Sequence, residues 1–312
     1  MMKRKLASNA RRGLLTIALI AVLPTPGWAA GEAPSAAEGP SVTLKARLNP
    51  GKTYTVRQVM DSEMTLPLGD AGKAHTTLEY LMKMAVGSAD PDGSKTVGVS
   101  MDGFKMKMDM GATTMEYDST DPNKQNPLLK GIMGQMAAKT FEARFDKDDK
   151  LVEAKKEGKK PAAAPNMMGM TLGEDEVKQI MSSLVDHGFP EGKVKPGDTW
   201  KHEMKSAMSQ MGSLAMAMEY EYLGETDYEG HACAKLRVKG GKAPAEPAKP
   251  GAPPAVMEIA KADLEGMVLF DNEEGIARYT EMNMDMNMSA GGAELPMKSK
   301  ATSTLVEIGK SE

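Results

Sequence analysis

Methionines recur at every second position in several stretches of the sequence, and methionine sulfur can bind soft metal ions. The stretch EMNMDMNMSA, residues 281–290, carries Met282, Met284, Met286 and Met288. The stretch WKHEMKSAMSQM, residues 200–211, places a histidine among methionines: His202, Met204, Met208 and Met211. Thioether sulfur and imidazole nitrogen together suit Cu(I) and similar soft ions such as Ag(I). These residues therefore suggest soft-metal binding, with the His202 stretch as the candidate site.

Strand geometry offers a second interpretation of the alternating methionines. Alternate residues of a strand share one face and lie about 6.6–7 Å apart, so the sulfurs of one strand cannot converge on one ion. The same alternation, with polar residues between, recurs at Met82, Met84, Met106, Met108, Met110, Met216 and Met218. So wide a distribution is typical of the apolar face of a whole sheet, where methionine adapts to irregular shapes. We expect a face that binds a hydrophobic ligand, lined by these seven methionines and by the four methionines of EMNMDMNMSA. The alternative is the soft-metal site in the His202 stretch.

Side chains that commonly carry catalysis form no recognisable motif. The four histidines, His75, His187, His202 and His231, have no zinc-binding spacing, and no His-Glu-x-x-His segment occurs. The sequence also contains no Gly-x-Ser-x-Gly elbow and no phosphate-binding loop. Asp and Glu fall mostly in turns and on polar strand faces, where charge is solvated. We expect a protein that is not an enzyme and has no cofactor.

The N-terminus has the features of a secretory signal peptide. Lys3, Arg4, Lys5, Arg11 and Arg12 precede the apolar segment GLLTIALIAVL, and small residues follow, which predicts a signal peptide over 1–29 with cleavage after Ala29. The general and the twin-arginine export routes both stay open. No later stretch has the ~20 apolar residues of a membrane-spanning helix. We therefore expect a periplasmic or extracellular protein with no integral membrane segment after cleavage.

Charge and cysteine content narrow the class of protein further. Cleavage leaves 39 − 5 = 34 Lys and Arg against 43 Asp and Glu, a net charge of −9, so we expect no nucleic-acid partner. Cys233 is the only cysteine, which excludes an intramolecular disulfide. It shares its strand parity with His231, Lys235 and Arg237, which predicts an exposed thiol.

Most of the mature chain alternates apolar and polar residues with a period of two, as half-buried antiparallel strands do. Examples are TTLEYLMKMAV, GFKMKMDMGAT, LAMAMEYEYLG and ATSTLVEIG, separated by turns rich in Asp and Gly. One amphipathic helix is predicted over 172–187, and a weaker one in NPLLKGIMGQMAAKT. The predicted fold is mainly β: a strongly curved antiparallel sheet, a half-barrel, with one or two helices on its concave face.

A faint internal repeat predicts how the sheet is organised. LNPGKTY and VKPGDTW share Pro-Gly-x-Thr-aromatic, and ARFDKDDKLVEA and VLFDNEEGIARY share a Phe-Asp turn. We expect a disordered lead-in over 30–41 and then one β-rich domain over 42–310. Its two related halves, about 44–157 and 189–309, would be joined by the helix at 172–187. The Ala- and Pro-rich segments 157–168 and 240–255 are predicted to be exposed loops.

Three motifs behind the signal peptide resemble those of a family of secreted bacterial proteins of unknown function. The motifs are LNPGKTY, FPEGKVKPGDTW and LEGMVLFDNEEGIARY. The family hallmark is Leu-x-Pro-Gly-x-x-Tyr near the start, then Leu-Pro-x-x-x-Val-x-x-Gly-Asp-x-Trp. Phe189 stands where the second motif usually has Leu, whereas Pro190, Val194, Gly197, Asp198 and Trp200 match. The resemblance covers about residues 44–308. It implies a sheet similar to the half-barrel of periplasmic lipoprotein carriers, and it implies no catalytic residues.

These observations leave three functions open. The first is a non-enzymatic protein that binds a lipid, an acyl group or an acylated protein on the methionine-lined concave face. The second is a periplasmic Cu(I)- or Ag(I)-binding protein that uses Met and His. The third is a structural or interaction module of the cell envelope whose core is filled. The first and third functions differ in what covers the apolar face. A gap left by the helices would be a binding site, whereas complete coverage would make the face a core.

Overall fold

The computed structural model describes residues 39–65, 72–127, 129–130, 140–157, 178, 181, 187–208, 212–243, 258–290 and 293–311. Strands dominate these residues, and they form two meanders. The strands of the first are β2 (Lys52–Thr65), β3 (Lys73–Val86), β4 (Lys95–Met110), β5 (Thr113–Asp118), β6 (Thr140–Phe145) and β7 (Leu151–Glu157). The strands of the second are β9 (Thr199–Met208), β10 (Gly212–Tyr228), β11 (His231–Lys242), β12 (Glu258–Asp271), β13 (Ile276–Ala290) and β14 (Ala293–Lys310).

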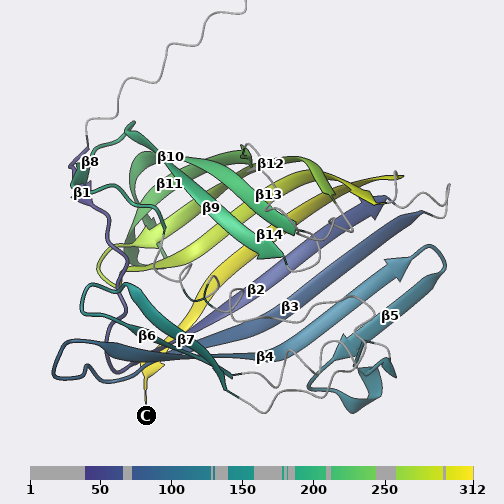
Figure 1. Ribbon diagram of the computed structural model, residues 1–312, viewed down its shortest axis with the longest axis horizontal. Helices are drawn as coiled ribbons and strands as arrows, with labels where there is room; N and C mark the ends of the chain where they lie inside the picture. Colours follow the sequence, from purple (N-terminus) through teal and green to yellow (C-terminus); the bar gives the residue numbers. More distant parts are fainter. Residues whose placement is uncertain are drawn as a thin grey trace, which may run out of the picture. The chain divides into compact units, whose positions relative to one another are not determined.

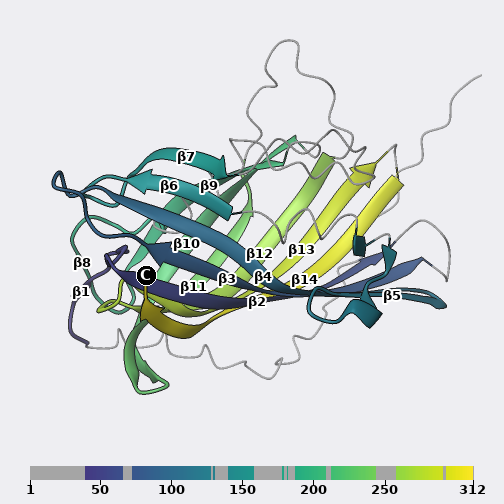
Figure 2. The same ribbon diagram turned by 90° about the horizontal axis from the view of Figure 1, so that it is seen from below.

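The two meanders join into one antiparallel sheet of 12 strands (Figure 1). Its order is β7-β6-β4-β3-β2-β14-β13-β12-β11-β10-β9, and β5 pairs with β4 beside this path. The first long strand of one meander, β2, therefore pairs with the last strand of the other, β14, as Figure 2 also shows. A separate pair, β1 (Val42–Thr43) with β8 (Lys193–Val194), forms a two-stranded sheet. The predicted mainly β, antiparallel fold is confirmed; the predicted strong curvature stays a prediction.

The predicted helices lie largely outside the described residues. Of the helix expected over 172–187, the structure describes Lys178 and Met181, both with helical backbone, and His187, which is not helical. Met181 is fully buried against the core of the first meander. A short 3₁₀ helix, η2, spans Pro122–Lys124. Among the described residues, none of the helices has the length and apolar content that a membrane crossing requires.

The predicted signal peptide, lead-in and loops lie partly or wholly outside the residues that the structure describes. Residues 1–38, which include the predicted signal peptide and most of the lead-in, are outside it. So is most of both predicted loops. The start of the predicted loop 240–255 is wrong, because β11 continues through Lys242. Gly240 and Gly241 pair with β10 on one side and β12 on the other, and these ladder hydrogen bonds keep the segment in the sheet.

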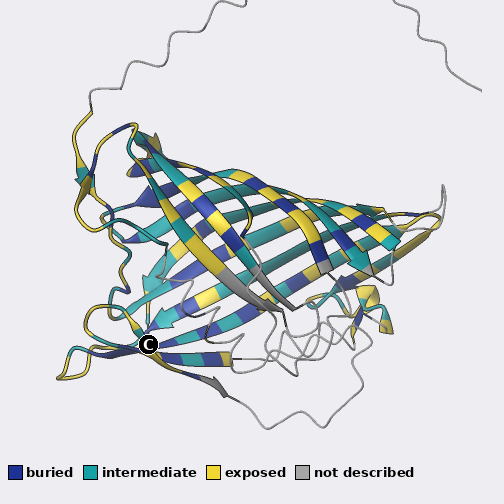
Figure 3. Ribbon diagram, turned by 45° about the horizontal axis from the view of Figure 1, so that its top comes forward, coloured by how far each residue is buried: buried dark blue, intermediate teal, exposed yellow. Residues whose placement is uncertain are grey.

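Alternate burial along the strands (Figure 3) arises because one face of the sheet packs into the core and the other meets water. The buried side chains form three groups, one on the first meander and two on the second. The first lies in the first meander and centres on Tyr54, Phe104, Phe141 and Phe145. The second is rich in methionine and lies over β10 to β14. The third centres on Tyr222, Leu236 and Phe270, with Phe189 and Trp200 packed against it.

The two Pro-Gly motifs form turns, as their sequences predict. Gly51 and Gly197 both have positive φ, 74° and 91°. The Asp198 carboxylate accepts a hydrogen bond of 2.9 Å from the backbone N–H of Lys195, which stabilises the second turn. Trp200 stacks on Tyr220, with ring centroids 5.6 Å apart. The motif therefore fixes the start of β9 and anchors it with an aromatic side chain.

The N-terminal segment of the domain is tied to the turn between β12 and β13. Arg47 N–H donates to the carbonyl of Gly275 (3.0 Å), and the Asn49 amide donates to that of Glu274 (2.8 Å). Lys52 forms an ion pair with Glu274 at 2.7 Å. Inside the same turn, Asp271 accepts from the N–H groups of Glu273 and Glu274, both at 2.9 Å. These contacts connect the start of the first meander to the second.

A buried ion pair lies under this turn. Arg278 Nε donates to Asp271 Oδ2 at 2.7 Å, and both side chains are almost completely buried. Burial alone would raise the pKa of Asp271, but hydrogen bonds from Glu274 N–H and Arg278 outweigh it and hold the pKa below its usual value. The carboxylate is therefore charged at neutral pH and depends on these donors.

Cys233 lies near the same ion pair, and the expectation of an exposed thiol is wrong. The side chain is fully buried on β11. Its parity does match that of the polar residues around it, but alternation does not predict burial at this position of β11. The charges of Asp271 and Arg278 are close enough to act on the pKa of the thiol. Burial raises the pKa of Cys233 to about 11, so the thiol stays protonated and unreactive at neutral pH.

Candidate functional site

The strand register places the predicted methionines on a single face of the sheet. Residues directly paired across an antiparallel ladder project from the same face. One such row crosses nine strands, from β4 to β9, and every member is apolar: Met106, Leu78, Met60, Ala301, Met282, Gly266, Val238, Tyr220 and Trp200. A second row on the same side, four residues further along β2, pairs Met110, Ala74, Met64, Met297 and Met286. We call the side from which these rows project the methionine face.

All eleven predicted methionines lie on this face, with different degrees of burial. Those that are buried are Met84, Met216, Met218 and Met288. Those that are half-buried are Met82, Met106, Met108, Met282, Met284 and Met286. Met110 is 37% exposed. The face thus contains both core side chains and side chains that water reaches.

Three further methionines, which the sequence pattern does not single out, lie on the same face. Met60, Met64 and Met297 lie on β2 and β14, the two strands that join the meanders. Met60 is 38% exposed. In VMDSEMT the apolar residues alternate with Asp and Glu as they do in EMNMDMNMSA, so the period-two signal was present. It is weaker there because Ser62 interrupts the apolar series.

Two glycines make room for methionine side chains that lie flat on the sheet. A Cβ built on Gly240 would stand 2.6 Å from the sulfur of Met218, its partner on β10. A Cβ on Gly266 would stand 2.5 Å from the sulfur of Met282, its partner on β13. Both sulfurs therefore occupy space that any other residue on the neighbouring strand would fill. At these two positions methionine acts as a packing residue.

The alternative metal cluster is only partly described. His202 pairs directly with Met218, and Met204 pairs with Met216, so β9 and β10 bring soft donors side by side. However, the sulfur of Met218 lies over Gly240 on β11, on the side of β10 away from His202. The side chain of Met208 and all of Met211 lie outside the described residues. Within the described ranges, no three His, Cys, Asp or Glu side chains group as metal ligands.

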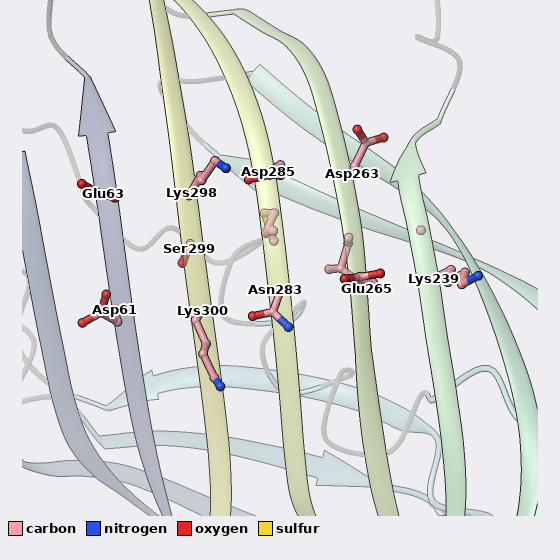
Figure 4. A pocket seen from close by; sticks show the side chains of 13 residues that line it. Asp61, Glu63, Lys239, Asp263, Glu265, Asn283, Asp285, Lys298, Ser299 and Lys300 are labelled. Atoms are coloured by element: carbon pink, nitrogen blue, oxygen red, sulfur yellow. The ribbon is translucent and has the colours of Figure 1, made fainter.

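The opposite face is charged and carries two adjoining hollows of about 710 and 260 Å³. Figure 4 shows the larger one, which crosses β2, β14, β13, β12 and β11. Its acidic side chains are Asp61, Glu63, Asp263, Glu265 and Asp285, and its basic ones are Lys239, Lys298 and Lys300. These charged hollows differ from the methionine-lined pocket that the sequence predicts.

Three charges of the larger hollow pair with side chains beside it. Lys300 contacts Glu281 at 2.9 Å, and this hydrogen bond holds the pKa of Glu281 below its usual value. His75 contacts Asp61 at 3.0 Å, and Lys261 contacts Asp263. Exposed pairs of this kind contribute little stability each. Charges of both signs on an open surface are typical of the solvated side of a sheet, which leaves the methionine face as the candidate site.

Comparisons with known proteins give no family. No family model matches the chain, and no curated protein matches it. Among solved structures, DynF from the dynemicin biosynthesis pathway of Micromonospora chersina is 7% identical with a TM-score of 0.21, over 93% of this chain and 94% of that one. An outer membrane channel from Pseudomonas putida F1 is 8% identical with a TM-score of 0.21, over 84% of this chain and 97% of that one. At these TM-scores the likeness supports no conclusion about function.

Proposed function

We propose that this protein is an exported, non-enzymatic binding protein that holds a hydrophobic ligand, a lipid or an acyl group, on its methionine face. The proposal includes cleavage of the N-terminal signal peptide, a periplasmic or extracellular location, and membership in the secreted family that its motifs resemble. The observation that carries it is the uninterrupted apolar row across nine strands, in which Met60 is 38% exposed. Contiguous apolar surface that water reaches is typical of an interaction or ligand-binding site.

Exposure at the margins of the face supports the same proposal. Met110 on β4 and Met204 on β9 are 37% and 40% exposed, whereas Met216 and Met288 between them are buried. A filled core would bury large apolar side chains throughout, so these exposed ones favour a surface that a ligand completes. Methionine suits this role because its flexible, polarizable side chain adapts to acyl chains of different shapes.

A neutral fluorescent dye tests the proposal. N-phenyl-1-naphthylamine, which brightens in apolar surroundings, should bind the wild-type chain saturably. Met60→Lys should weaken its binding at least about tenfold, since the ammonium group must be desolvated where the dye sits. Fluorescence titration measures both dissociation constants.

Val152→Lys is the matched control for this titration. Val152 is an exposed apolar residue on the edge strand β7, so the same charge placed there should leave dye affinity unchanged. Circular dichroism checks that both variants are folded. A wild-type chain that does not bind the dye, or equal affinities for all three proteins, would show that the methionine face is not the binding site.

A further inference from the structure

Two short polar rows lie within the methionine face, on either side of the fully apolar row. In the first, Thr76, Ser62 and Ser299 pair across β3, β2 and β14. In the second, Gln58, Ser303 and Thr280 pair across β2, β14 and β13. All six side chains are half-buried. Because each row is two residues from Met60 or Ala301, the rows lie about 6.6–7 Å to either side of the apolar row.

These polar groups retain hydrogen-bonding capacity. Gln58 donates to the Ser303 hydroxyl at 2.9 Å, which leaves the Ser303 proton free to donate. Ser62 donates to the carbonyl of Thr76 at 3.3 Å, which leaves its oxygen free to accept. Within the described ranges, the hydroxyls of Ser299 and Thr280 have no protein partner. A wholly apolar ligand would desolvate these groups without replacing their hydrogen bonds to water, which is costly.

Formal charge is absent from this part of the face. No Asp, Glu, Lys or Arg belongs to the described rows that contain Met284, Met282 and Thr280. The charged side chains next to these rows, Asp61, Glu63, Asp285, Lys298 and Lys300, project from the opposite face instead (Figure 4). Lys242, which projects from the methionine face on β11, donates its ammonium group to the carbonyl of Ile259. A ligand carboxylate or phosphate placed here would lose water and gain no counter-charge.

We propose that the methionine face takes a neutral amphiphile. Its hydrocarbon chain lies along the methionines, and an uncharged hydroxyl, ester or amide group bonds to the six polar residues around Met60 and Ala301. This inference rests on the proposed function and adds the chemical class of the ligand. Charge complementarity carries it, because the face offers hydroxyl and amide partners and offers no formal charge.

A displacement titration tests the inference. Two ligands of equal chain length, dodecan-1-ol and dodecanoate, compete with N-phenyl-1-naphthylamine at pH 8. For each ligand, the dissociation constant of a variant is divided by that of the wild-type chain. This ratio does not depend on how soluble the ligand is in water. Ser62→Ala/Ser299→Ala should weaken the binding of the alcohol about three- to tenfold relative to the binding of the dye, the value of one or two hydrogen bonds. Ser299→Lys should shift the preference toward dodecanoate at least about tenfold, because it supplies the missing counter-charge.

Controls come from the other face of the same strand. Thr302 pairs with Glu281 and Val59 on the charged face, so Thr302→Ala and Thr302→Lys should change neither ratio. If the dye binds but the Ser62 and Ser299 variants behave as wild type, the neutral-amphiphile inference is overturned and the proposed function stands. If the wild-type chain prefers dodecanoate and Ser299→Lys adds nothing, the inference is also overturned. If the dye does not bind at all, the proposed function fails with it.

Discussion

Met288→Asp should lower the free energy of unfolding by at least about 3 kcal/mol. Met288 is 4% exposed and pairs directly with Ile259 on β12 and Leu295 on β14. The substitution removes a buried apolar side chain, which alone costs about 2–5 kcal/mol, and leaves a carboxyl group without a partner among apolar neighbours. Urea denaturation followed by circular dichroism measures the change.

Two control variants show whether the loss of stability comes from burying a carboxylate rather than from substituting the residue. Met288→Leu keeps the apolar volume and should cost less than about 1.5 kcal/mol. Asn283→Asp places the same carboxylate on the same strand but on the exposed, charged face, between Lys300 and Glu265, and should cost less than about 1 kcal/mol. Equal stabilities of Met288→Asp and Asn283→Asp would contradict the register, which places Met288 on the buried face of β13 and Asn283 on the charged face.

Arg278→Ala should destabilise the fold by about 3–5 kcal/mol, because it leaves the buried Asp271 carboxylate without its charged donor. Arg237→Ala is the matched control, since its ion pair with Glu221, at 2.8 Å, is exposed. Loss of an exposed pair should cost no more than about 1 kcal/mol. Denaturant midpoints of the two variants measure the difference, and equal midpoints would contradict the role of the buried pair.

The cost of Arg278→Ala should depend on pH in a defined direction. The pKa of Asp271 is lowered in the folded protein, so its contribution to stability is present above its unfolded pKa, about 3.9. That contribution is lost as the pH falls through the folded value. The difference between wild type and Arg278→Ala should therefore be largest near neutral pH and shrink below about pH 4. A difference that grows toward acid would contradict this assignment.

Period-two patterning was enough to predict the antiparallel sheet and the shared face of its methionines. Burial of one face forces apolar residues onto alternate positions, so EMNMDMNMSA and GFKMKMDMGAT carry the signal within a few residues. Long-range pairing leaves no comparable local signal. That β2 joins β14, and so adds Met60, Met64 and Met297 to the face, follows from contacts between residues more than 200 positions apart.

Local parity was also a poor guide to burial at one position of β11. Cys233 has the parity of exposed neighbours, yet it is buried near Asp271 and Arg278 at the far end of the sheet. Likewise, the sequence shows which residues of β11 to β14 are charged but not that their face is hollowed by about 710 Å³. Both features depend on how neighbouring strands and turns pack, which the alternation of a single strand does not encode.

Native mass spectrometry of the chain purified from its own host without detergent tests the central claim most directly. We predict a bound mass that matches a neutral lipid, released on unfolding, and missing from Met60→Lys purified in the same way but retained by Val152→Lys. A bare chain in every sample, or a bound copper or silver ion in place of a lipid, would contradict the claim that the methionine face holds a hydrophobic ligand.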